Sequence, residues 1–223
     1  PQSALSAACY GKKSLSIPFR LIMDPPRSAS LNMAIDEVLM SSQKKQDLLP
    51  TLRFYRWALP AYSIGYFQNI AMVVKRFECA EKKISVVRRL TGGGLVFHGG
   101  DLTFSLCIKT PNSFFKGDVK ASYLKVNEAL RGGLSQIFQG LDYADCKSAP
   151  SGRATPERVC FDAPTCYDLL WKGKKVVGAS QRRLGEALLH QSTVFLGEGD
   201  GLLARQVIRG FESEWDVEFV EQP

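Results

Sequence analysis

Two glycine-rich segments, each continuing into an alternation of apolar and polar residues, constrain the fold of this chain most. The first is RRLTGGGLVFHGGDLTFSL, residues 88–106, and the second is VCFDAPTCYDLLWKGKKVVGASQRR, residues 159–183. Glycines at such points allow tight turns with positive φ, and residues that alternate between two faces are typical of strands. The chain is therefore expected to contain hairpins, which join neighbouring antiparallel strands.

The same kind of periodicity predicts further elements along the chain. Strands are expected at residues 52–57, 61–67, 85–89, 94–98, 102–109, 167–171, 174–177 and 187–196, and helices at 30–42, 75–83 and 122–138. Strands at this density, mostly joined by hairpins, predict an α+β domain in which helices flank a largely antiparallel or mixed sheet. We expect residues 1–17 to form a loose N-terminal arm and residues 18–223 to form this single catalytic domain.

One helix and one strand carry a definite prediction about burial. The helix 30–42 is expected to have Ser30 as its N-cap. Its core-facing side chains are expected at a helical spacing, namely Leu31, Ala34, Ile35, Val38 and Leu39. The strand 102–109 has one apolar face, and its other face is expected to border a groove or solvent. That polar face carries Thr103, Ser105 and Cys107.

The chain carries a formal net charge of +7 and has a pI near 9.1. Such a balance often indicates nucleic-acid binding, but the basic residues are dispersed and no helix-turn-helix or RNA-binding signature is present. An acidic protein partner would be attracted equally well, and a lysine-rich solvated surface explains the charge without any partner. We therefore expect no nucleic-acid partner. We also expect no membrane span, because no apolar run approaches about 18–20 residues.

The N-terminal residues lack the pattern of a signal peptide, which predicts a cytoplasmic protein. The chain starts at Pro1 rather than at Met, so an organelle-targeting segment upstream stays open. In the cytoplasm the six cysteines are expected to be free thiols. They show no metal-binding spacing and there are only two histidines, His98 and His190, so no metal site is expected. Each histidine is expected to be a hydrogen-bonded structural residue rather than a base.

Three consecutive glycines, Gly92, Gly93 and Gly94, form a turn whose main-chain amides lie open to a ligand. Arg88 and Arg89, directly before it, supply cationic donors suited to phosphate or carboxylate. A glycine-rich hairpin with both arginines solvated is an equally good interpretation, because the spacing matches neither a P-loop nor a dinucleotide fingerprint.

Cys160 and Lys175 are separated by fifteen positions, with a hairpin-like stretch between them. If the hairpin folds back, the lysine ammonium can approach the thiol and stabilise its thiolate, the form that acts as a nucleophile in acyl transfer. From the spacing alone, a buried inert cysteine and a surface lysine turn is the favoured interpretation.

Several blocks, in this order along the chain, resemble the lipoate–octanoate branch of the biotinyl/lipoyl ligase-like family. They are NMAIDE (Asn32–Glu37), LRFYRW followed by Ser63-Ile64-Gly65, RRLTGGGLVFH and GKKVVGASQRR. The resemblance covers residues 20–196 and implies a fold related to that of class II aminoacyl-tRNA synthetases. In that family, the glycine block and the lysine block line one pocket for an acyl-adenylate or a transferring acyl group. Carried over, the substrate-binding residues are Arg88, Arg89, Gly92, Gly93, Gly94, His98, Gly178 and Ala179.

The blocks are more similar to the cysteine-dependent octanoyltransferases and amidotransferases than to the ligases. Lipoate–protein ligases usually read GRND or GPND before the lysine hairpin, where this chain has CFDAPTCYDL. In the transferases a cysteine is acylated and a lysine stabilises its thiolate, and Cys160 and Lys175 match these two catalytic positions. Cys166, six residues on, is then expected to be a packing residue. Gln191 stands where the family commonly has a glycine after its histidine, so its strand is expected to approach the pocket differently.

The resemblance implies an acyltransferase that moves an octanoyl or lipoyl group from a carrier-bound thioester to a specific lysine of a lipoyl-carrier domain, through a Cys160 acyl-enzyme. The expected donor is an acidic acyl-carrier protein or a lipoyl domain. The expected acceptors are 2-oxoacid dehydrogenase E2 and the glycine-cleavage H protein, and no cofactor is expected. One alternative is an ATP-dependent lipoate–protein ligase, which would use ATP and Mg²⁺ to form lipoyl-AMP. Another is a non-catalytic module that binds acyl groups or lipoyl domains.

Overall fold

The computed structural model describes residues 16–45, 48–115, 118–145, 164–166, 168–195 and 200–222. Of the expected N-terminal arm, only residues 16 and 17 fall within these ranges, and Cys160 lies outside them. Among the described residues, no helix combines the length and the apolar character that crossing a membrane requires.

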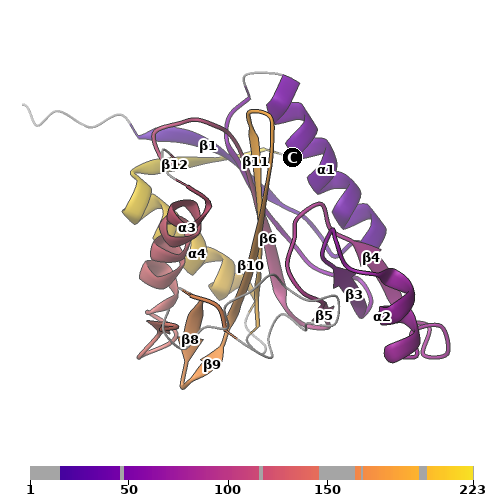
Figure 1. Cartoon of the computed structure of the whole chain (residues 1–223). Coiled ribbons are helices and arrows are strands. Elements are labelled where there is room, and N and C mark those ends of the chain that lie inside the picture. Colours follow the sequence, from indigo (N-terminus) through magenta and orange to yellow (C-terminus); the bar gives the residue numbers. More distant parts are fainter. Residues whose placement is uncertain are drawn as a thin grey trace, which may run out of the picture.

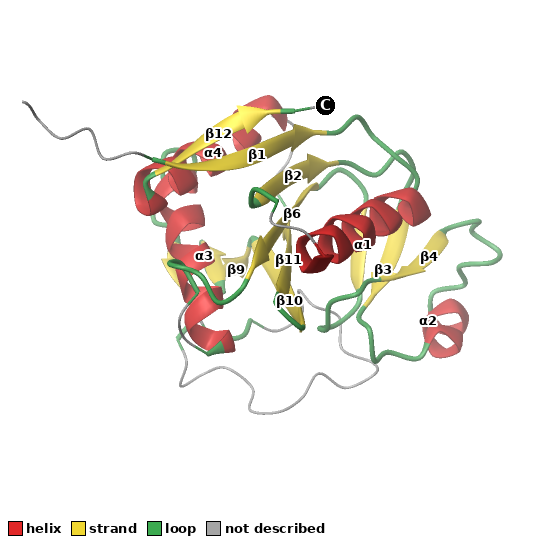
Figure 2. Cartoon of the chain, turned by 90° about the horizontal axis from the view of Figure 1, so that it is seen from above, coloured by secondary structure: helices red, strands yellow, loops and turns green. Residues whose placement is uncertain are grey.

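Helices and strands alternate irregularly along the chain (Figures 1 and 2). The described helices are α1 (Ala29–Lys45), α2 (Ile70–Arg76), α3 (Val119–Leu134) and α4 (Asp200–Trp215). The described strands are β1 (Ile17–Met23), β2 (Thr51–Tyr55), β3 (Ala61–Ile64), β4 (Ser85–Arg88), β5 (Val96–His98), β6 (Leu102–Lys109), β7 (Asp142–Tyr143), β8 (Leu169–Trp171), β9 (Lys174–Lys175), β10 (Val177–Leu184), β11 (Ala187–Val194) and β12 (Val217–Glu221).

The largest sheet has six strands in the order β10-β11-β6-β2-β1-β12. The first four strands of this order are antiparallel neighbours, whereas β1 runs parallel to both β2 and β12. Two three-stranded sheets, β4-β3-β5 and β7-β8-β9, lie beside it. The expected α+β class is confirmed, and the six-stranded sheet is mixed.

The two faces of the six-stranded sheet are covered by different elements (Figure 1). Helices α3 and α4 pack on one face and bury the main apolar core, in which Phe104, Leu130 and Phe211 are almost fully buried. Helix α1 covers the other face, on the side of the sheet β4-β3-β5. The polar side chains that line the pocket described below lie on the α1 face.

Local turn chemistry explains the hairpins that the sequence predicts. Lys172 and Gly173 have positive φ values of 50° and 73°, which is the geometry of the two-residue turn between β8 and β9.

Strand β6 has the predicted bounds, but it lies between two partners and is covered on both faces. Ser105 and Cys107 are therefore fully buried, and the expectation of an open polar face holds only for Thr103, which lines a pocket.

Helix α1 is present but is turned differently from the sequence prediction. It begins at Ala29, and the Oγ of Ser28, not that of Ser30, accepts a bond from the main chain of Leu31 at 3.3 Å. Val38, expected to face the core, is 62% exposed, whereas Asp36 is 1% exposed. The prediction was confirmed for Leu39, which is 9% exposed, and was wrong for Val38. The helix covers a polar part of the sheet, so polar residues face inward.

Other differences concern position and pairing. The predicted helix at 75–83 is wrong: α2 spans Ile70–Arg76, with the side chain of Asn69 capping it at Ala71, and Glu78 and Lys83 lie in turns with positive φ. The prediction had no element for β1, β7, α4 or β12. The predicted strand 174–177 corresponds to β9, and β10, which belongs to the six-stranded sheet, had no predicted strand beyond residue 177.

Two glycines of α3 have opposite surroundings and provide a stability test. A Cβ on Gly133 would lie 1.9 Å from the main-chain oxygen of Gln206 in α4, whereas one on Gly132 would meet only the flexible side chain of Glu214, at 3.2 Å. Gly133→Ala should therefore force the helices apart and lower the free energy of unfolding by about 1–3 kcal/mol or more. Gly132→Ala should be neutral or stabilising by up to about 1 kcal/mol, because alanine favours the helix. Urea unfolding measures both, and equal effects would contradict the close helix contact.

Candidate active site

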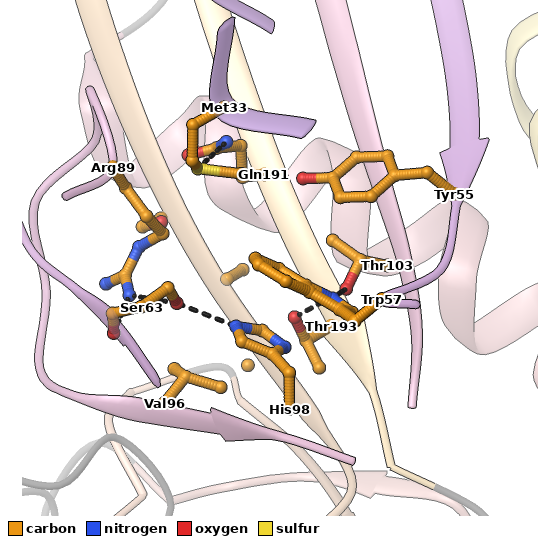
Figure 3. A pocket seen from close by; sticks show the side chains of 13 residues that line it. Met33, Tyr55, Trp57, Ser63, Arg89, Val96, His98, Thr103, Gln191 and Thr193 are labelled. Carbon is orange, nitrogen blue, oxygen red and sulfur yellow. Dashed lines mark hydrogen bonds between the residues drawn. The ribbon is translucent and has the colours of Figure 1, made fainter. Parts of the chain in front are cut away.

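One pocket lies between the sheet β4-β3-β5 and the α1 face of the six-stranded sheet (Figure 3). It brings together the predicted residues Arg89, His98, Gly178 and Ala179. The other lining residues are Met33, Tyr55, Trp57, Ser63, Val96, Thr103, Ser180, Gln191 and Thr193. The predicted residues Arg88, Gly92, Gly93, Gly94 and Lys175 are not part of this lining.

His98 is held at both ring nitrogens. Its Nδ1 lies 2.8 Å from Oδ2 of Asp101, and its Nε2 lies 2.7 Å from Oγ of Ser63. Both neighbours are buried, and the Trp57 ring stacks on the imidazole with ring centroids 3.8 Å apart. The expectation of a hydrogen-bonded histidine is confirmed, but Asp101, three residues on, makes it part of a pair that the sequence prediction did not recognise. In the sequence, the signal for this pair is an acidic residue three positions after the histidine.

Burial and the neighbouring charges determine the protonation state of His98. Burial, helped by the positive charge of Arg89, keeps the pKa of His98 below its ordinary value despite the Asp101 carboxylate. Burial alone would raise the pKa of Asp101, but hydrogen bonds from His98 and Thr103 hold it below the ordinary value. At neutral pH the imidazole is therefore neutral and donates from Nδ1–H to Asp101, so Nε2 accepts a hydrogen bond from the hydroxyl of Ser63.

The glycine turn is shaped by Arg89. Its Nη1 donates to the main-chain oxygen of Ser63 at 2.7 Å, and its Nη2 donates to the main-chain oxygens of Gly92 and Gly94 at 2.9 and 2.8 Å. Gly93 has a φ of 88°, and a Cβ on Gly65 would lie 2.1 Å from the Gly93 oxygen. The glycines are thus needed for a tight turn and a close approach of two main chains.

Arg88 supports the neighbouring loop. Its Nη1 donates to the main-chain oxygens of Tyr66 and Gln68 at 2.7 and 2.8 Å. Gly65 donates from its main-chain nitrogen to the side chain of Gln68 at 2.9 Å. Both arginines therefore contribute to the shape of the pocket wall, and their role as binding residues stays a prediction.

Strand β11 presents Gln191 to the pocket and His190 to the opposite face. Gln191 accepts a hydrogen bond from Thr91 at 2.6 Å and donates to Asp36 at 2.7 Å, which joins the glycine segment to α1. His190 lies 2.9 Å from Gln181 and 2.6 Å from Ser192, and burial lowers its pKa to about 3. Since side chains alternate along a strand, the glutamine and not the histidine takes part in the pocket.

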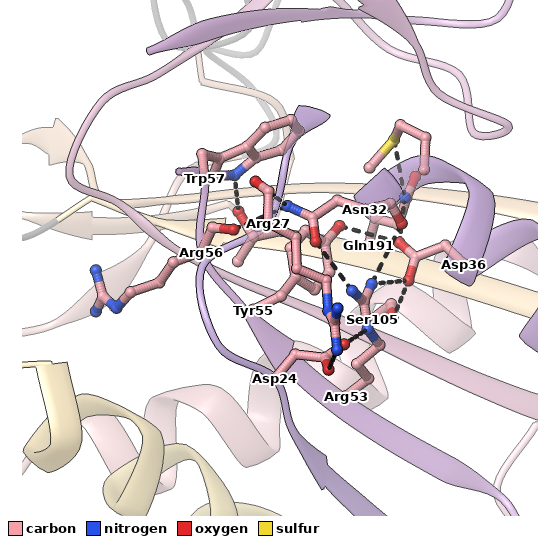
Figure 4. A network of polar contacts seen from close by, with 12 residues as sticks. Asp24, Arg27, Asn32, Asp36, Arg53, Tyr55, Arg56, Trp57, Ser105 and Gln191 are labelled. Atoms are coloured by element: carbon pink, nitrogen blue, oxygen red, sulfur yellow. Dashed lines mark hydrogen bonds and ion pairs between the residues drawn. The ribbon is translucent and has the colours of Figure 1, made fainter. Parts of the chain in front are cut away.

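A buried ionic network joins β2 to α1 next to the pocket (Figure 4). The fully buried Arg53 donates to Asp24 at 2.6 Å, to Asp36 at 2.8 Å and to the side chain of Asn32 at 2.9 Å. Asp36 also accepts a hydrogen bond from the hydroxyl of Tyr55 at 2.9 Å. Through Asp36, the network fixes Tyr55 and Gln191, two pocket-lining side chains. In the sequence, Asp36 is part of the block Asn32–Glu37, but no local pattern indicates its role in this network.

Lys175, the predicted catalytic lysine, forms an ion pair with Asp168. Its Nζ lies 2.7 Å from Oδ2 of Asp168, and the two side chains are 3% and 8% exposed. The same carboxylate oxygen accepts hydrogen bonds from the main chain and the hydroxyl of Thr165, at 2.6 and 2.8 Å. The side chain of Lys175 is thus buried and fixed by its ion pair with Asp168, and Lys175 is not a free surface lysine. Asp168 was missed, although the hairpin register places it close to the lysine.

The cysteines are only partly described. Cys166 is disulfide-bonded, so the expectation of free thiols throughout is wrong for this residue. Cys79 and Cys107 are free and buried. Cys9, Cys146 and Cys160 lie outside the described residues, and the catalytic role of Cys160 stays a prediction. The described part of the chain contains no group of three or more acidic, histidine or cysteine side chains arranged to hold a metal.

Curated proteins similar to this chain in sequence include octanoyltransferases. The octanoyltransferase LipM of Moorella thermoacetica is 36% identical over 174 residues, covering 78% of this chain and 63% of the relative. The octanoyltransferase LipM of Carboxydothermus hydrogenoformans is 37% identical over 169 residues, covering 76% and 61%. The chain thus spans less than two thirds of the length of these curated relatives.

The fold has solved counterparts. The structure of protein Ta0514 from T. acidophilum with bound lipoic acid is similar with a TM-score of 0.72 at 24% identity, covering 92% of this chain and 89% of that one. At this identity the likeness concerns the fold. The family profile of the lipoyl protein ligase A/B catalytic domain matches residues 28–216. Because this match covers most of the sequence, the chain belongs to the lipoyl protein ligase A/B catalytic domain family.

Proposed function

We propose that the chain is an acyltransferase that moves an octanoyl group from a carrier-bound thioester to a specific lysine of a lipoyl-carrier domain. The observation that carries the proposal is the identity of 36% to an octanoyltransferase in a chain whose lysine hairpin holds a buried Lys175. A buried, oriented lysine is the arrangement that a cysteine nucleophile needs from its partner, since the thiolate is the reactive form.

The reaction has two steps. The Cys160 thiolate attacks the thioester carbonyl, the carrier sulfur leaves as a thiolate and takes up a proton, and an octanoyl-enzyme thioester remains. The neutral amine of the acceptor lysine then attacks this thioester, loses a proton and forms the amide, while Cys160 leaves as thiolate. Lys175 stabilises the thiolate in both steps, and main-chain amides of the glycine turn are suited to hold the oxyanion.

The proposed partners follow from this chemistry. The donor is an acidic carrier that bears an acyl thioester, and the acceptors are lipoyl domains such as those of 2-oxoacid dehydrogenase E2 and the glycine-cleavage H protein. No cofactor takes part, because the thioester already supplies an activated acyl group. The cytoplasmic location stays a prediction.

Intact mass spectrometry tests the proposal. Wild type incubated with octanoyl-carrier protein, without ATP and with a thiol reductant present, is expected to gain one octanoyl group. Cys160→Ala should gain none, whereas Cys166→Ser should still be acylated. An unmodified wild type, or an adduct that survives in Cys160→Ala, would exclude the mechanism. Transfer that needs ATP and free acid would instead indicate a lipoate–protein ligase.

A further inference from the structure

An exposed apolar group lies beside the glycine turn that walls the pocket. Tyr66, Phe67 and Ile70, here named the aromatic corner, are 40%, 87% and 42% exposed. The rings of Tyr66 and Phe67 contact each other with centroids 5.1 Å apart. Large apolar side chains that are exposed together on a rigid surface mark sites where another protein binds.

The aromatic corner is fixed to the pocket wall. The main-chain nitrogen of Tyr66 donates to the oxygen of Thr91 at 2.9 Å, at the start of the glycine turn. Arg88 binds the main-chain oxygens of Tyr66 and Gln68. Phe67 also follows the pocket residue Ser63 by only four positions. The corner is therefore held at the rim of the site, where preorganisation lowers the entropic cost of binding.

The surroundings of the corner are basic. Residues 66–88 contain five basic and two acidic side chains, all of them exposed. The acidic Glu78 is already paired with Lys82 at 2.9 Å, and the guanidinium of Arg182 lies over the Tyr66 ring at 4.1 Å. Figure 2 shows α2 at an edge of the molecule, away from α3 and α4. A partner bound here would have to be acidic around an apolar centre.

We propose that the aromatic corner docks the acidic carrier domain that presents the acceptor lysine. A lysine amine stands on a stem of four carbons, so the acceptor must bring its own folded surface to the rim of the pocket. A donor that carries its acyl group on a long prosthetic arm can remain farther away. This inference rests on the proposed function, because it assigns one of its two partners to a surface.

The test separates docking from chemistry. Octanoyl-enzyme is isolated and mixed with an apo lipoyl domain or with hydroxylamine, a nucleophile that needs no docking surface. Phe67→Ser is expected to raise the KM for the lipoyl domain about tenfold, as for an interface anchor. Discharge by hydroxylamine and loading from octanoyl-carrier protein should stay within about twofold of wild type. Phe67→Tyr should retain the wild-type KM, and Leu202→Ser, an exposed apolar change on α4 at a residue 55% exposed, should have no effect.

Three results would overturn the inference. The first is an unchanged KM for the lipoyl domain in Phe67→Ser. The second is slower loading from octanoyl-carrier protein with normal transfer, which would assign the corner to the donor. The third is a wild-type dimer, seen by light scattering, that Phe67→Ser dissociates. If wild type forms no acyl-enzyme, the proposed function fails, and titration calorimetry of the apo lipoyl domain against wild type and Phe67→Ser still decides where the domain binds.

Discussion

Lys175→Met is expected to slow formation of the octanoyl-enzyme by about 10²–10³-fold, the loss typical of removing a group that stabilises charge in the transition state. The ammonium is the group proposed to stabilise the Cys160 thiolate, and methionine keeps the length of the side chain without its charge. The rate is measured by stopped samples and intact mass. Lys174→Met is the matched control, because Lys174 is the adjacent lysine and its side chain is exposed.

A second comparison separates chemistry from folding in this hairpin. Lys175→Met leaves the carboxylate of Asp168 buried without its cation, which by itself destabilises the protein. The double variant Lys175→Met/Asp168→Asn removes that charge, so its stability should recover towards wild type. Its acylation should remain slow if the lysine acts in the reaction. Recovery of the acylation rate together with stability would show that Lys175 is only a structural partner of Asp168.

Arg53→Met is expected to lower the free energy of unfolding by about 3–5 kcal/mol, the range for breaking a buried ion pair by removing one partner. Arg53 is fully buried and bonds Asp24 and Asp36 at 2.6 and 2.8 Å. Without the guanidinium, both carboxylates lose their buried cation. Urea unfolding at pH 7 measures the change.

The control for this prediction is an ion pair of similar length in a different environment. Lys82→Met removes the partner of Glu78, a pair at 2.9 Å whose side chains are 55% and 57% exposed. Because solvent screens exposed charges, this change should lower the free energy of unfolding much less than Arg53→Met does. A loss below about 1 kcal/mol in Arg53→Met would mean that the network contributes little to stability. Octanoyl transfer should also fall in Arg53→Met, since Asp36 fixes Tyr55 and Gln191.

Local sequence patterns predicted the structural features that depend only on residues close together in the sequence. The hairpin turn at Lys172-Gly173, the bounds of β6 and the presence of α3 follow from turn chemistry and periodicity within a few residues. The family followed from signature blocks, whose identity and order do not depend on contacts. The orientation of α1 could not be predicted, because it depends on the polar face of the sheet beneath it.

The sequence alone therefore determined the class of fold, the family, and the pairing of Cys160 with Lys175 as a hypothesis. Only the tertiary structure decided which partners hold the functional side chains. His98 meets Ser63 across 35 positions of the chain, and Gln191 meets Asp36 across 155. Such contacts form because buried polar groups need hydrogen-bond partners, and the packing of distant segments decides which partners are within reach. The periodicity of neighbouring residues in the sequence carries no information about these long-range partners.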